Sequence, residues 1–177
     1  MNAPSPRELI SALAQVGELK SLRRAGWLRA GVPEPESVAA HSFRAILLAF
    51  LLAPDLGVDP DRLCRLLLVH DLAESDPAVG DITPHCGISR DEKRRLENDA
   101  MIRLCRTLPR GDEILALWKE YDEGSTLEAA LAHQIDALDM GLQAREYQQR
   151  TGLDLDEFVH SALQRISHPA LRALLEA

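Results

Sequence analysis

Aromatic residues make up only 4% of the 177-residue chain, and long runs of β-branched residues are nearly absent. Both features disfavour a β-sheet protein, because aromatic and β-branched side chains are the ones enriched in strands. Leucine and alanine, which favour helices, are abundant instead. No segment alternates convincingly between apolar and polar residues. The composition therefore predicts an all-α protein.

Long hydrophobic runs are also missing. The longest apolar run, AILLAFLLA at 45–53, is far shorter than the ~20 residues that cross a bilayer. The first ten residues, MNAPSPRELI, lack the apolar core of a signal peptide. Cysteines are few, odd in number and without CxxC spacing (Cys64, Cys86 and Cys105), which favours a reducing compartment. We expect a soluble, cytoplasmic protein that binds no membrane.

The chain has no excess of positive charge. Its net charge of −8 argues against binding to a nucleic acid polymer, which needs an extended basic face. It does not exclude a small anionic substrate, because a local cluster of cations overrides the net charge. One such cluster contains Lys20, Arg23, Arg24 and Arg29. It is either a solvated helix end or part of an anion site.

Repeats, low-complexity tracts and linkers are absent as well, which predicts one domain over residues 1–177. Helical periodicity predicts a bundle of about seven or eight helices around one core. The expected helices are 6–19, 37–53, 60–73, 89–108, 111–122, 125–150, 154–166 and 169–176. Pro54 is expected to end the second helix, and Ser89 and Ser125 to begin the fourth and sixth with capping boxes. Residues 20–36 and 75–88 are expected to be irregular.

Titratable side chains fall on the apolar faces of three of these helices. His41 follows the inward row of 37–53, and His70 follows that of 60–73, with Asp71 beside it. Asp136 and Asp139 flank the inward row of 125–150. A lone histidine on an apolar face is usually a hydrogen-bonded core residue. Two histidines and two aspartates from three helices, however, suit one divalent cation such as Mn, Fe, Co, Ni or Zn, which would offset the cost of burying them.

The pattern H…HD…D, formed by His41, His70–Asp71 and Asp136, resembles the ligand set of the HD-domain metal-dependent phosphohydrolases. Six further segments resemble the 5′-deoxynucleotidase branch of that family: GW at 26–27, ESVAAHSFR at 36–44, HDLAE at 70–74, GDITP at 80–84, EYDEGST at 120–126 and DALDMGLQAREY at 136–147. The resemblance covers about residues 19–160. It implies an HD-domain bundle and an enzyme that removes phosphate from deoxynucleoside 5′-monophosphates.

The resemblance also implies roles for particular residues. The metal ligands would be His41, His70, Asp71 and Asp136, with Asp139 as the second choice for the last position. The ion would be Mn, Co, Fe, Ni, Zn or Mg. Glu74 would assist catalysis together with Asp71, projecting beside the metal if the helix continues that far. The substrate-binding residues would be Arg24, Trp27, Asp81, Ile82 and Thr83, with Lys20 as a further source of positive charge. Trp27 would form a wall against the nucleotide, or it is an ordinary core residue.

Some alternatives stay open at this stage. The segment 75–80 is about two residues longer than is usual in this branch, which leaves the position of Asp81 open, with Asp76 as its alternative. Two alternative functions also stay open: a phosphohydrolase of another nucleotide phosphoester, and a metal-retaining binding module without turnover. The resemblance implies a homodimer, and Leu171, Leu174 and Leu175 either join two subunits or cap the core. His85 and His133 are expected at the surface.

Overall fold

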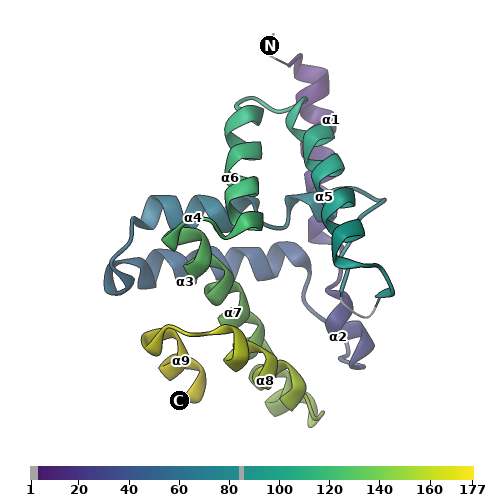
Figure 1. Cartoon of the computed structure of the whole chain (residues 1–177). Helices are drawn as coiled ribbons and strands as arrows, with labels where there is room; N and C mark the ends of the chain where they lie inside the picture. Colours follow the sequence, from purple (N-terminus) through teal and green to yellow (C-terminus); the bar gives the residue numbers. More distant parts are fainter. Residues whose placement is uncertain (1–3, 84–85) are drawn as a thin grey trace.

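A computed structural model describes residues 4–83 and 86–177, and within them the chain forms nine α-helices and two 3₁₀ turns (Figure 1). Pro84 and His85, the last residue of GDITP and a histidine expected at the surface, lie outside the described residues. The elements are α1 (Pro6–Gly17), η1 (Glu18–Lys20), α2 (Ala25–Arg29), α3 (Val38–Leu56), α4 (Pro60–Val69), η2 (Leu72–Ser75), α5 (Arg90–Cys105), α6 (Gly111–Glu123), α7 (Leu127–Thr151), α8 (Asp156–Arg165) and α9 (Pro169–Glu176). The predicted all-α fold is confirmed.

The helices pack around α3, α4 and α7. Figure 1 shows α3 and α4 side by side, with α5 and α6 on one side of this pair and α7, α8 and α9 on the other. The core between them is built from leucines and isoleucines of α4 and α7 and from alanines of α3, and its fully buried members include Leu66, Leu67, Ile135, Leu138 and Ala49. Small alanine side chains let α3 approach its neighbours closely, which brings His41 against both other helices.

Four local expectations are wrong. Residues 20–36 contain the short helix α2. Pro54 lies inside α3, and the helix ends at Gly57, whose positive φ allows its N–H to bond back to Ala53 and Pro54. The N-cap of α7 is Thr126, one residue after the expected Ser125. Finally, α4 ends at Val69, and a separate 3₁₀ turn follows it.

Helix α3 is long and apolar enough to cross a membrane by length and composition alone, with a mean hydropathy of 1.4. Core helices of soluble proteins share this property. Only 28% of the apolar window is buried. The exposed part is a stripe of large side chains, Phe43, Leu47, Phe50 and Leu51, which we call the α3 stripe.

Gly141 sets the distance between α7 and the last two helices. A Cβ atom at this position would lie 2.9 Å from the Cβ of Ala162 in α8 and 2.7 Å from Cδ2 of Leu175 in α9. Ala162, Leu171 and Leu175 are fully buried, so the C-terminal leucines at 171 and 175 cap the core, while Leu174 is 44% exposed. The close contact at Gly141 fixes where α8 lies along α7.

We predict that Gly141→Ala destabilises the fold by about 1–3 kcal/mol, because the added methyl overpacks a contact in which Ala162 has no flexible side chain to move. Gly17→Ala is the matched control. Gly17 ends α1 with ordinary helical dihedral angles and has open space at its Cβ position, so the change is expected to stabilise by up to about 1 kcal/mol. Urea unfolding of both variants measures this. Equal stability of the two would contradict the packing role of Gly141.

Candidate functional site

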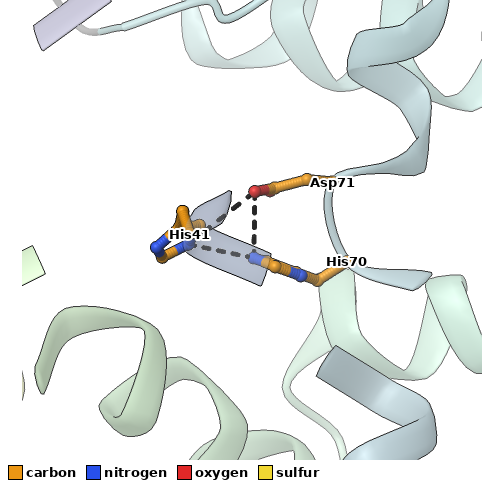
Figure 2. Close-up of side chains that lie close together, drawn as sticks. All are labelled: His41, His70 and Asp71. Atoms are coloured by element: carbon orange, nitrogen blue, oxygen red, sulfur yellow. Dashed lines mark hydrogen bonds and ion pairs between the residues drawn. The ribbon is translucent and has the colours of Figure 1, made fainter. Parts of the chain in front are cut away.

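His41, His70 and Asp71 point toward one another from α3 and from the end of α4 (Figure 2). Nε2 of His41 lies 3.4 Å from Nε2 of His70 and 3.8 Å from Oδ2 of Asp71, and Nε2 of His70 lies 3.0 Å from the same oxygen. Both imidazoles are buried. The end of α4 at Val69 turns the chain so that His70 and Asp71, although adjacent in sequence, face the same point.

The other nitrogen of each ring fixes its orientation. Nδ1 of His70 lies 2.7 Å from the carbonyl oxygen of Leu67, and Nδ1 of His41 lies 2.6 Å from Oδ2 of Asp139. A neutral imidazole that donates through Nδ1 presents a lone pair on Nε2. Two such lone pairs 3.4 Å apart cannot bond to each other, but they suit a cation placed between them.

Asp136 lies outside the compact group of His41, His70 and Asp71 but contacts it at Nε2 of His41, whereas Asp139 lies on the opposite side of that ring. Oδ1 of Asp136 is 3.2 Å from Nε2 of His41, and its Oδ2 accepts a 2.6 Å hydrogen bond from Arg165. The carboxylate of Asp139 is fully buried and is already bonded by Nδ1 of His41 and by Nε of Arg44. Of the two aspartates, therefore, only Asp136 offers an oxygen to the ring nitrogens that face inward.

A second group, Glu36, His41 and Asp139, is also compact enough to hold an ion. Its carboxylates are in use, however, because Glu36 accepts the indole N–H of Trp27 at 3.0 Å and Asp139 pairs with Arg44. The first group has unused oxygens instead. Among the residues that the structure describes, Oδ2 of Asp71 and Oε2 of Glu74 are buried without a hydrogen-bond partner. Two orphaned carboxylate oxygens beside two imidazole lone pairs fit a divalent cation.

Three titratable side chains of the site have pKa values shifted from their usual ones, because they are buried close to other charges. Burial lowers the pKa of His41, but hydrogen bonds to Asp136 and Asp139 outweigh it and raise the pKa to about 9, so a metal ion at Nε2 would have to displace a proton. Burial raises the pKa of Asp71, yet the charges of His70, His41 and Arg24 hold it at about 2. Burial, Asp71 and Asp81 together raise the pKa of Glu74 well above its usual value. The carboxyl groups of Asp71, Glu74 and Asp136 all line both cavities near this point, and their combined negative charge favours a cation there.

Two cavities of about 360 and 750 Å³ meet at this cluster. Asp71, Glu74, Asp136 and Arg165 line both of them. The larger cavity extends toward Trp118, Tyr121 and His133, and the smaller one toward α2 and α8. His133 was expected at the surface, but it is half-buried and lies 2.7 Å from the carbonyl of Tyr121.

The expected substrate-binding residues line the smaller cavity: Arg24, Trp27, Asp81, Ile82 and Thr83. The contacts of Trp27, Asp81 and Ile82 show how these residues are held in place. Trp27 is only 1% exposed and packs against Phe158 at a centroid distance of 4.4 Å. The carboxylate of Asp81 accepts the backbone N–H of Ala25, which ties the GDITP loop to the start of α2. Ile82 uses its carbonyl to accept from Nζ of Lys93 at 2.9 Å.

Three details of the sequence interpretation need correction. Glu74 was expected on a continuing α-helix, but it lies in the 3₁₀ turn η2, which still directs it into both cavities. Lys20 is exposed and lines neither cavity. Asp76 forms a 2.6 Å ion pair with Arg103 and also lines neither cavity, so of these two aspartates only Asp81 lines the smaller cavity.

Sequence reasoning missed the contribution of α8 and α5. Phe158, Ser161 and Arg165 line the smaller cavity from one face of α8, and Lys93 of α5 lines both cavities. The spacing of the α8 residues at 158, 161 and 165 is helical and was available from the sequence. No motif marked them, however, and the pairing of α8 with α7 is a tertiary contact.

We predict that Asp139→Asn lowers the affinity for a divalent metal by about 10–100-fold, because the neutral amide no longer orients and polarises His41. Glu146→Gln is the matched control, since Glu146 pairs with the same Arg44 but is exposed. It is expected to change metal affinity less than about fivefold. Calorimetric titration of metal-stripped protein measures both. Unchanged affinity in Asp139→Asn would refute the orienting role.

The comparisons with known proteins agree with this geometry. A family model described as HD domain matches residues 16–175. The 5′-deoxynucleotidase HDDC2 of Danio rerio is 39% identical over 96% of this chain and 85% of its own length, and that of Homo sapiens is 38% identical over 96% and 83%.

Solved structures are similar too. The PH0347 protein of Pyrococcus horikoshii is 35% identical with a TM-score of 0.79, covering 94% of each chain. A protein of Magnetospirillum magnetotacticum, described as a predicted metal-dependent phosphohydrolase, is 30% identical with a TM-score of 0.73 over 96% of this chain and 93% of its own. The resemblance inferred from the motifs is thereby confirmed, and the chain belongs to the HD-domain family.

Proposed function

We propose that the protein is a metal-dependent phosphomonoesterase that hydrolyses deoxynucleoside 5′-monophosphates to a deoxynucleoside and phosphate. The observation that carries this proposal is the convergence of two imidazole nitrogens with orphaned carboxylate oxygens where two cavities meet. The relatives named 5′-deoxynucleotidase, which are similar over nearly the whole chain, support the choice of substrate.

The residues that would hold the metal are His41, His70, Asp71 and Asp136. A bound divalent ion lowers the pKa of water and neutralises charge that develops on a phosphoryl group. The ion is Mn, Co, Fe, Ni, Zn or Mg, and the ligand set of nitrogen and oxygen favours the transition metals among these. Asp71 has a second role, because its Oδ2 lies 3.8 Å from Nη1 of Arg24 and ties that cation to the site.

Glu74 is the proposed acid–base group. It is buried and lines both cavities, and burial together with the charges of Asp71 and Asp81 raises its pKa well above the usual value of a glutamate, which favours proton exchange at this position. In its protonated form Glu74 would give a proton to the leaving oxygen of the deoxynucleoside, and in its ionised form it would accept one from the attacking water. Asp81 helps to raise the pKa of Glu74, which links the GDITP loop to proton transfer.

The substrate would lie in the smaller cavity. Arg24 faces Asp71 there and supplies a guanidinium that suits phosphate oxygens. Trp27 forms the floor of the cavity rather than an exposed wall, because Phe158 covers one face of its ring. Ile82 and Thr83 form the rim on the side of the GDITP loop.

Two alternative functions are distinguished by the activity measurement described below. One is hydrolysis of a different nucleotide phosphoester, and another is a binding module that keeps the metal without turnover. The orphaned Oε2 of Glu74 favours catalysis, because a site that only bound a metal through His41, His70, Asp71 and Asp136 would not need that carboxylate. A cytoplasmic location without membrane or nucleic acid partners completes the proposal, in keeping with the net charge of −8.

We also propose that two copies of the chain associate through the α3 stripe. Its side chains are 71% (Phe43), 44% (Leu47), 60% (Phe50) and 58% (Leu51) exposed. They present about 400 Å² of apolar surface, roughly half of the ~800 Å² that each partner buries in a stable interface. A membrane is a poorer occupant, because interfacial helices are rich in Lys and Arg, whereas the one cation of α3, Arg44, is held by Asp139 and Glu146.

We predict metal-dependent phosphate release from deoxynucleoside 5′-monophosphates, and little from ribonucleoside 5′-monophosphates or from 3′-monophosphates. Metal-stripped protein is resupplied with Mn, Co, Ni, Zn or Mg in turn, and phosphate release is measured for each substrate. In Glu74→Gln, turnover is expected to fall by about 10²–10⁴-fold while the metal content stays that of the wild type.

The control for this measurement is Glu123→Gln, which neutralises an exposed glutamate that lines neither cavity. Its activity is expected to equal that of the wild type. Absence of release with every metal, from protein shown to hold one, would favour the binding module. Release from a different phosphoester would favour the other hydrolase, and full activity in Glu74→Gln would remove Glu74 from the mechanism.

We predict that Phe50→Glu converts a dimer to a monomer, because it places a charge in the middle of the α3 stripe. Leu127→Glu is the control. Leu127 is 63% exposed, lies outside the stripe and begins α7, where an acidic residue is tolerated. Light scattering after gel filtration measures the mass of each variant. A wild type that is monomeric at all concentrations, or a dimeric Phe50→Glu, would overturn this interface.

A further inference from the structure

Arg165 lies where the two cavities meet. It is the last residue of α8, and its side chain lines both cavities. Its Nη2 donates to Oδ2 of Asp136 at 2.6 Å, and the side chain is still 42% exposed. A guanidinium carries five N–H groups in a rigid planar fork. Within the described residues Asp136 is its one hydrogen-bond partner, so most of these donors remain available to a ligand in the cleft.

The backbone that carries Arg165 is firmly placed. Helices α7 and α8 run antiparallel, since Gln148 bonds Asp156 at one end of the pair and Asp136 bonds Arg165 at the other. Between these two contacts, Ala162 packs against Gly141. Arg165 follows Ala162 by three residues, and its position over Asp136 is therefore set by a close helix–helix contact rather than by a loop.

The cations Lys93, Arg24 and Arg165 line the cavities near this junction, and their contacts differ. The ammonium of Lys93 donates a hydrogen bond to the carbonyl of Ile82 at 2.9 Å and forms an ion pair with Glu97 at 3.4 Å. Arg24 faces Asp71 from α2 at 3.8 Å. Arg165 approaches the same cluster from α8 through Asp136. A dianionic phosphate that enters past Asp71, Glu74 and Asp136 meets like charges, and cations from two separate helices would offset that repulsion.

We propose that Arg165 is a substrate-binding residue that contacts the phosphoryl oxygens of the nucleotide, with its hydrogen bond to Asp136 aiming the guanidinium. This inference rests on the proposed function of the cleft. It names a contact that none of the sequence motifs contains, because α8 lies beyond the last of them. The competing explanation is that Arg165 only orients Asp136, and the experiment has to separate binding of phosphate from binding of metal.

The test is calorimetric titration of inorganic phosphate, and of deoxyadenosine as a ligand without phosphate, into protein saturated with Mn. We expect Arg165→Gln to weaken phosphate binding by about 10–100-fold and to leave deoxyadenosine binding unchanged. Arg165→Lys keeps a cation beside Asp136 but loses the planar fork, and it is expected to weaken phosphate binding by a smaller factor. Arg95→Gln, an exposed arginine that lines neither cavity, is expected to match the wild type.

Metal affinity is measured separately for each variant, and phosphate is titrated at Mn concentrations that saturate that variant. Unchanged phosphate affinity in both Arg165 variants under these conditions would overturn the proposal and leave Arg165 as a positioning residue for Asp136. A wild type that binds no phosphate would overturn it as well. Because the titration needs no turnover, loss of phosphate binding in Arg165→Gln supports the contact even if the wild type hydrolyses no deoxynucleotide, an outcome that would count against the proposed function alone.

Discussion

The burial of His41 among carboxylates is the constraint on which the rest of the site depends. His41 has no exposed surface; Asp139 lies against its Nδ1, and Asp136 lies 3.2 Å from its Nε2 on the opposite side. Burying ionised groups costs several kcal/mol for each ion unless partners compensate. Arginines supply part of that compensation: Arg44 pairs with Asp139, Arg165 with Asp136 and Arg24 with Asp71. The oxygens left over on Asp71 and Glu74 are those that a divalent cation would satisfy.

The helix ends decide where these groups meet. The end of α4 at Val69 and the 3₁₀ turn after it direct His70, Asp71 and Glu74 toward α3 and α7. On the other side of the cleft, the N–H of Ala25 bonds the carboxylate of Asp81, which holds Asp81 at the start of α2. The absence of a side chain at Gly141 lets α8 lie close to α7, where Arg165 bonds Asp136. The close helix contact at Gly141 thus determines whether the positive charge of Arg165 lies beside Asp136.

Most of the fold followed from the sequence, because helical periodicity and capping residues are local signals. The failures were also local. The helix α2 has only five residues, and Pro54 was tolerated near the end of α3 because Gly57 provides the stronger stop signal. In the site, His41, His70, Asp71 and Asp136 stood out as titratable residues on or beside apolar rows. Arg165 and the role of Asp139 could not be found in this way. Their roles depend on the groups that they hydrogen-bond, and tertiary packing decides which groups these are.

The most direct test of the metal centre is anomalous diffraction from crystals of the protein loaded with Mn. The account predicts one strong peak between Nε2 of His41 and Nε2 of His70, within coordinating distance of Asp71 and Asp136. A peak beside Glu36 and Asp139, on the Nδ1 side of His41, would contradict it and would move the catalytic centre to the second group of ligands. The two positions lie on opposite sides of one imidazole ring, so a single data set decides between them.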